Sequence, residues 1–294
     1  MKNLMKHLQE KYHYAVVVFK ELVKTDFQLR YQGSFLGMVW SVLKPLMLFG
    51  VMYVIFVRFL KFTDGTPTFA ISLLCGTCLW SFFTESTTMG LSSIVNRGDL
   101  LRKVHFPNYI VVAATNTGAL ISLGLGLIVV ILFGAFSGAH FTWRVLLVPF
   151  SIIQLYCLAL GVSLVLATLY VYFRDIAQIW EVLLQALFYS IPIIYPLSMV
   201  ARSYPIVAKL MMLNPIAQPI MDIRHNLLSP EYVPTVWTHT ADLGGAIDTP
   251  DVPAGWQWLN SPCLSILPYL FTVLVLWLGI HLFRKYSQKF AEVL

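Results

Sequence analysis

The chain has 294 residues, of which 58% are hydrophobic and 12% are charged, and its mean hydropathy is +0.73. This composition excludes a soluble globular domain and indicates an all-α integral membrane protein. The formal net charge of +6 does not indicate nucleic-acid binding, because no basic soluble module is there to carry it.

The predicted elements begin with an amphipathic helix over residues 12–32. Apolar side chains recur there at steps of three and four residues, and charged side chains take the other face. Such a helix lies in the membrane interface with its lysines near anionic headgroups. It is either a topological anchor or a strut that also contacts a cytoplasmic partner, and the second interpretation is favoured. The residues of interest on it are Phe19, Lys20, Lys24 and Arg30.

The next stretch, YQGSFLGMVWSVLKPL, leads into the first apolar run. Gly33 and Gly37 interrupt the surface helix and let the chain turn into the membrane. Lys44 can extend to the headgroups, and Pro45 stands where a freed carbonyl is tolerated. We therefore predict an elbow between the surface helix and the first span.

Six stretches are predicted to cross the membrane, since a hydrocarbon core about 30 Å thick needs roughly 20 helical residues. Basic residues gather before the first span, after the second and fourth, and after the last, which predicts that both termini lie in the cytoplasm. The charged N-terminus is not typical of a cleaved signal peptide, so the first span is expected to remain. The predicted spans are 45–57 (completed by the residues before it), 69–91, 109–136, 145–173, 180–200 and 264–283.

The segment between the second and third spans is expected to carry a short cytoplasmic helix within residues 96–107, ended by Pro107. A helix of this size is unstable alone in water, so we expect it to dock on a partner, and a loop lying on the lipid is the alternative. Its cations could instead attract the pyrophosphate of a lipid carrier, which is the less favoured interpretation. The residues assigned to docking are Arg97, Asp99, Leu100, Leu101, Arg102, Lys103 and His105.

The end of the fifth span is divided by prolines at positions 192, 196, 205, 215 and 219. The apolar pieces between them are too short to cross a membrane, so we expect short re-entrant helices. The region 201–262 is predicted to be external, and its acidic, tryptophan-bearing part, 231–262, is predicted to form a cap. The whole chain, 1–294, is interpreted as one transmembrane domain.

Catalytic chemistry is not indicated by any motif. No P-loop, metal-ligand spacing of histidines or nucleophile elbow occurs, so we expect no catalytic residue, no metal site and no cofactor in this chain. Cys75 and Cys78 could suggest redox or metal chemistry, but within an apolar helix packing is the favoured interpretation. Glu85 either lines a polar path or bonds its serine and threonine neighbours.

Aromatic side chains make up 14% of the chain. Belts at the two membrane interfaces explain many of them, whereas those nearer the middle could offer rigid faces to sugar rings. Their spacing does not decide between these roles. The candidate residues for a transport pathway are Trp80, Phe83, Glu85, Phe188, Tyr189 and Tyr195.

Three blocks of sequence, in this order, resemble the membrane subunit of ABC-2 type polysaccharide exporters. They are RYQGSFLGMVWSVLKPL, LLRKVHFPNYIV and FRDIAQIWEVLLQALFYSIPIIYP. This family moves lipid-linked teichoic acids, O-antigens and some capsules. Two departures from its pattern are Lys44, where a neutral polar residue is more usual, and the long external segment 231–262.

The resemblance implies a homodimer of six-span subunits in a bacterial cytoplasmic (inner) membrane, joined by two separate ATPase subunits that bind ATP and Mg. It implies that residues 96–107 form a coupling helix on the ATPase, and that an undecaprenyl-linked polysaccharide passes between the two copies. We expect wall teichoic acid as the substrate, with O-antigen or capsule as the alternative. An ion-coupled carrier or flippase that works without an ATPase is a further alternative, and a membrane-embedded transferase is disfavoured by the missing catalytic cluster.

Overall fold

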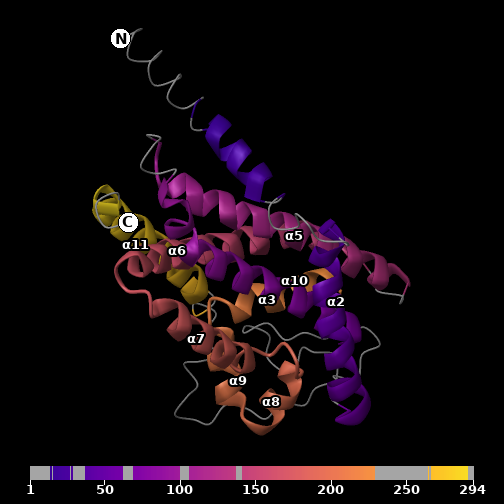
Figure 1. Ribbon diagram of the computed structural model, residues 1–294. Coiled ribbons are helices and arrows are strands. Elements are labelled where there is room, and N and C mark those ends of the chain that lie inside the picture. Colours follow the sequence, from indigo (N-terminus) through magenta and orange to yellow (C-terminus); the bar gives the residue numbers. More distant parts are fainter. Residues whose placement is uncertain are drawn as a thin grey trace.

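The computed structural model describes residues 14, 16–26, 28, 37–61, 69–99, 106–136, 141–228, 264 and 266–290. Within these residues all regular structure is helical and no strand occurs, which confirms the predicted all-α class. Figure 1 shows the N-terminal helical segment, residues 16–26, at the top of the molecule and the short helices α8 and α9 at the bottom, with the helix bundle between them.

Five stretches of the described chain are long and apolar enough to cross a membrane. The five stretches are α2 (Trp40–Met52) with the π-helix η2 (Tyr53–Phe59), α3 (Phe69–Ser92), α5 (Tyr109–Phe136), the 3-10 turn η4 (Trp143–Leu147) with α6 (Val148–Tyr172), and α11 (Ile266–Tyr286) with η8 (Ser287–Lys289). The bounds predicted for α5 are the same as those in the structure, because its apolar run has no interruption.

The helix predicted over 180–200 is not continuous. The helix α7 (Ile176–Ser190) ends before Pro192, and α8 (Leu197–Ser203) begins after Pro196. A proline lacks a backbone N–H and pushes the residue before it out of the helical region, so the two prolines separate the helices. The 15 residues of α7 extend roughly 22 Å, less than the hydrocarbon thickness. The predicted bounds were therefore wrong, and a sixth crossing stays a prediction.

Three short helices follow α7, as the prolines predicted: α8, α9 (Pro205–Met212) and α10 (Ala217–Leu227). Pro205 occupies the first position of α9, where its missing N–H costs nothing. A cluster of apolar side chains holds the three helices together, namely Leu197, Ala201, Ala208, Met212 and Met221. Their re-entry into the membrane stays a prediction, and the predicted cap, 231–262, lies outside the described residues.

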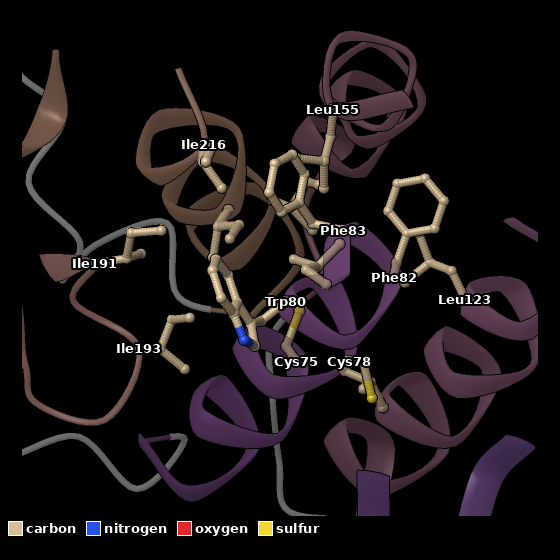
Figure 2. Close-up of a cluster of buried hydrophobic side chains, with 14 of the residues drawn as sticks. Cys75, Cys78, Trp80, Phe82, Phe83, Leu123, Leu155, Ile191, Ile193 and Ile216 are labelled. Carbon is tan, nitrogen blue, oxygen red and sulfur yellow. The ribbon is translucent and has the colours of Figure 1, made fainter. Parts of the chain in front are cut away.

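The most buried of the candidate membrane spans is α3, which packs against α2, α5, α6, α7 and α10. Figure 2 shows the apolar cluster around it, in which Phe82 and Phe83 are joined by Leu123 of α5 and Leu155 of α6. The free thiols of Cys75 and Cys78 are buried in the same cluster. The core of the molecule is therefore built around one central helix.

Two glycines let α6 and α11 touch along their backbones. A Cβ atom at Gly161 would lie 2.8 Å from the backbone N and Cα of Leu276, and a Cβ atom at Gly279 would lie 2.5 Å from the carbonyl oxygen of Gly161. Small residues promote such close contacts between membrane helices, which attract one another mainly by van der Waals packing. The α6–α11 pair is accordingly the most extensive helix contact in the described chain.

Replacing Gly161 by valine is expected to separate α6 from α11 and to destabilise the detergent-solubilised protein by at least about 1–3 kcal/mol, the usual cost of overpacking. The measurement is the fraction of monodisperse protein that remains after a temperature series. Gly124→Val is the matched control, because a Cβ atom at Gly124 meets no atom within 4 Å. Equal melting of the two variants would contradict the proposed backbone contact.

Candidate functional site

One end of the bundle carries an apolar cluster that joins segments far apart in the sequence. Its buried members come from the turn after α3, the start of α5, the second half of α6 and the C-terminal segment. Leu22 of the N-terminal helical segment packs against its side. We call it the loop cluster, and it consists of Ile94, Val111, Val112, Leu164, Ala167, Val171, Phe283 and Phe290.

The loop cluster fixes both ends of the segment that was predicted to carry the coupling helix. At one end, Ile94 is fully buried just before the 3-10 turn η3 (Val95–Arg97). At the other end, Asn108 Nδ2 donates a hydrogen bond to the carbonyl oxygen of Ser287 at 3.2 Å. Both ends of the connection between α3 and α5 are therefore fixed to the helix bundle.

Arg97, predicted to contact a partner protein, forms an ion pair within the chain. Its guanidinium forms an ion pair with the Asp26 carboxylate of the N-terminal helical segment, and the two side chains are 19% and 12% exposed. Burial lowers the pKa of Arg97. The pair joins the N-terminal helical segment to the loop. Asp26 was not among the predicted residues, because its partner is distant in the sequence.

The other predicted docking residues are described only in part. Asp99 is exposed, whereas Leu100, Leu101, Arg102, Lys103 and His105 lie outside the described residues. On the N-terminal helical segment Phe19 is half-buried and Lys20 and Lys24 are exposed, while Arg30 lies outside the described residues. Docking on a partner therefore stays a prediction.

Of the predicted elbow, Gly37 and the residues after it are described, whereas Gly33 lies outside the described residues, so the elbow stays a prediction. Gly37 has a φ of +50°, in the left-handed region that side chains with a Cβ atom rarely adopt. It begins a short 3-10 turn, η1 (Gly37–Val39), that leads into α2. Lys44 is exposed and Pro45 is buried within α2, where the proline removes one helical hydrogen bond.

A groove of about 840 Å³ runs between α2, α3 and α7. Leu48 and Met52 of α2 form one wall, and the other two walls mix aromatic with polar side chains. The aromatic and polar residues are Trp80, Thr84 and Thr88 from α3, and Gln178, Trp180, Glu181, Gln185, Phe188 and Tyr189 from α7. The aliphatic residues Leu91 of α3 and Ala177 and Leu184 of α7 complete the lining.

Tilted pairs of aromatic rings connect α7 to α3 beside the groove. The ring centroids of Trp80 and Phe188 are 5.6 Å apart, and those of Phe83 and Trp180 are 6.4 Å apart. Trp180 Nε1 donates a hydrogen bond to Thr87 Oγ1 at 3.1 Å. Trp180 was not among the predicted pathway residues, although its four-residue spacing to Leu184 and Phe188 placed it on the same helix face.

The structure brings most of the predicted pathway residues together. Trp80, Phe188 and Tyr189 line the groove, and Phe83 is buried against Trp80 with ring centroids 5.8 Å apart. The Tyr195 hydroxyl donates a hydrogen bond to the carbonyl oxygen of Tyr189 at 3.0 Å, next to the end of α7. Glu85 is half-buried on α3 and does not line the groove.

A polar network holds α10 against its neighbours at the other end of the bundle. Gln154 Nε2 of α6 donates to Gln218 Oε1, and Gln218 Nε2 donates to Asp222 Oδ2, both at 2.9 Å. Arg144 of η4 donates to His225 Nε2 at 2.8 Å. The short helix is thereby tied to α6 and to the turn that precedes it.

Two ionisable groups of α10 belong to this part of the fold, the buried Arg224 and the half-buried Asp222. Arg224 Nη1 donates to the carbonyl oxygen of Pro192 at 2.7 Å, which fixes the break after α7. Burial raises the pKa of Asp222 from 3.8 to about 6, and the hydrogen bond from Gln218 lowers it by less. The role of Arg224 was not predictable from sequence, because its partner Pro192 lies 32 residues earlier in the chain.

Comparison with known proteins points to one family. The sequence profile of the ABC-2 type transporter family matches residues 17–228. An O-antigen export system permease protein of Myxococcus xanthus is 31% identical over 195 residues, which cover 66% of this chain and 74% of the relative. Two O-antigen export system permease proteins of Klebsiella pneumoniae are 25% and 22% identical over 277 residues, 93% of each chain.

Reversing one charge of the Asp26–Arg97 pair is expected to release the N-terminal helical segment from the loop, at a cost of up to about 3 kcal/mol. Asp26→Arg or Arg97→Asp alone should increase proteolysis within the segment, and the double variant should restore protection. The control is Glu21→Arg, which changes an exposed acidic residue on the same segment. A double variant as sensitive as the single ones would contradict the pairing.

Asp222→Asn is expected to stabilise the protein above pH 6. Because the pKa of Asp222 is higher in the folded state, its contribution to stability falls as pH rises from about 3.8 to about 6. The variant should gain about 1–3 kcal/mol at pH 8 and nothing near pH 4, measured by thermal unfolding across pH. Asp175→Asn controls for the loss of a charge. A gain that does not depend on pH would argue against a buried, titrating carboxyl.

Proposed function

Because this chain belongs to the ABC-2 type transporter family, we propose that it is the membrane subunit of an ATP-driven exporter of a lipid-linked polysaccharide of the O-antigen kind. The observation that carries the proposal is the groove between α2, α3 and α7, which combines aromatic rings with polar side chains among membrane-type helices. Such a lining suits a chain of sugars, which presents both hydroxyl groups and apolar ring faces.

The choice of substrate departs from the expectation drawn from the sequence. Wall teichoic acid is not supported, whereas the two relatives that match 93% of this chain are both O-antigen export permeases. An ion-coupled carrier also has little support, because Glu85, which it would need as an ionisable relay, does not line the groove. The O-antigen alternative is therefore the proposal.

The complete exporter contains two copies of this chain and two copies of a separate ATPase subunit, which binds ATP and Mg. The whole chain forms one transmembrane domain with six crossings in the bacterial inner membrane and both termini in the cytoplasm. The polysaccharide, linked to undecaprenyl, passes between the two copies. The open faces of α2 and α7 support this arrangement, since few of their side chains are buried within one copy.

The transmission of force begins at residues 96–107, on which the ATPase acts when ATP closes it. The loop cluster and the Arg97–Asp26 ion pair connect this segment to α3 and to the N-terminal helical segment. Gly37, with its left-handed backbone, lets that segment turn relative to α2. Rigid-body shifts of α2 and α7 then open the path, and α8–α10 form its outer mouth.

Replacing Leu101 by aspartate or Arg102 by glutamate is expected to reduce, at least fivefold, the ATP hydrolysis of the complex formed with the ATPase encoded beside this chain. The physical reason is the loss of apolar contact, or of positive charge, at the docking segment. The measurement is co-elution and ATPase activity after reconstitution in lipid. Arg58→Glu, at the opposite end of the first span, is the control.

Export is measured separately in cells that lack their own O-antigen permease. Expression of this chain with its ATPase should restore long-chain O-antigen on the surface. A chain that elutes without the ATPase and transports on an ion gradient would overturn the proposed function.

A further inference from the structure

We propose that the groove between α2, α3 and α7 binds an uncharged stretch of the sugar chain, and that Glu181 excludes polymers that carry phosphate in their backbone. This inference rests on the proposed function and adds a charge-based selection of the substrate class. The inference is drawn from the polar atoms that line the groove and from the negative charge of Glu181 among them.

Three polar side chains of α7 form a row along the groove. Gln178, Glu181 and Gln185 follow one another at steps of three and four residues, so they lie on one face of the helix. None of the three has a hydrogen-bond or ion-pair partner within the described part of the chain. Their donors and acceptors are therefore available to a ligand.

A fourth polar group faces them from α3. Thr84 lines the groove, and its hydroxyl oxygen is buried without a hydrogen-bond partner in the described structure.

The polar row on α7 is long. Gln185 lies roughly 14 Å along α7 from the first residue of that helix, at 1.5 Å of rise per residue. The row therefore extends well beyond the first turn of the helix.

Polar groups without partners are costly against hydrocarbon, so this groove does not suit a lipid tail. A groove along α11 shows the contrast, because its lining is entirely apolar and fits acyl chains. The lining of that second groove consists of Leu267, Leu270, Phe271, Val273, Leu274 and Trp277. We infer that the α2–α3–α7 groove takes water or a polar, hydroxyl-rich ligand.

The aromatic side chains at one end of the groove restrict the class of ligand further. Trp80, Phe188 and Tyr189 follow the polar row in the direction of the break after α7, with Phe188 and Tyr189 packed edge to face. Amides, a carboxylate and a hydroxyl can hydrogen-bond sugar hydroxyls, and flat rings can cover the apolar face of a pyranose. The groove therefore offers both hydrogen bonds for sugar hydroxyls and flat rings for the apolar face of a sugar.

The charge of the groove decides between classes of polymer. Glu181 is the sole charged residue among the described residues that line it, and no lysine or arginine does so. Proteins bind phosphates mainly with arginine, lysine and helix N-termini, so a carboxylate in a lining that holds no cation repels a phosphate-bearing chain. A neutral glycan meets no such repulsion.

The test compares two probes on the complete complex of this chain with its ATPase in lipid nanodiscs. The probes are a linear neutral mannose hexasaccharide and a hexamer of glycerol phosphate, and binding is measured by calorimetry at fixed ionic strength. We expect the wild type to bind the neutral probe at least tenfold more tightly. Glu181→Lys should shift the preference at least tenfold toward the phosphate probe, and Glu181→Gln should shift it less.

Asp175→Lys is the matched control, because it makes the same change of charge at the start of α7, outside the groove. Asp175 is exposed and caps no backbone N–H with its side chain. Gln185→Leu should weaken binding of the neutral probe several-fold without restoring the phosphate probe.

Equal or tighter binding of the phosphate probe by the wild type, binding of neither probe, or an unchanged preference in Glu181→Lys would each overturn the inference. Complex formation and ATP hydrolysis are measured on the same samples. A complex that hydrolyses ATP but shows no charge preference would remove this inference and leave the proposed function standing. Failure to form a complex would count against the proposed function itself.

Discussion

The structure depends on one constraint: polar groups within a hydrocarbon layer must find partners inside the protein. Threonine hydroxyls along the spans meet it by donating to the carbonyl four residues earlier, as in Thr87 to Phe83 and Thr168 to Leu164. Ser163 of α6 lies within hydrogen-bond distance of Asn116 Oδ1 on α5, and Gly90 of α3 leaves room for it. Along the groove, the buried hydroxyl of Thr84 has no such partner in the described structure.

Sequence patterns predicted the features that depend on length and local composition. The bounds of α5 and the division of the chain after Pro192 follow from apolar runs and from missing backbone donors. The fifth span was placed too far along the chain, because its apolar composition continues past the proline that ends the helix. The Asp26–Arg97 pair and the Trp180–Thr87 hydrogen bond were not predictable, since each joins residues that only the folded bundle brings together.

The central helix α3 connects the two regions to which function is assigned. Its last turn leads to Ile94 in the loop cluster, and its middle presents Trp80 and Thr84 to the groove. A displacement at one end of a rigid, buried helix is carried to the other with little loss, because packed cores resist deformation. The apolar core around α3 therefore serves stability and also fixes the distance between loop and groove.

The contact between Gly161 and Gly279 bears on how such a subunit can diversify. With α6 and α11 joined at their backbones, the fold has a part that tolerates almost no change. By contrast, α7 follows the end of α6 and is joined to α3 mainly by aromatic contacts, and Leu184 alone among the side chains of α7 is buried. A substitution at an exposed position of α7 therefore disturbs the packing of one subunit less than a substitution at Gly161 or Gly279 does.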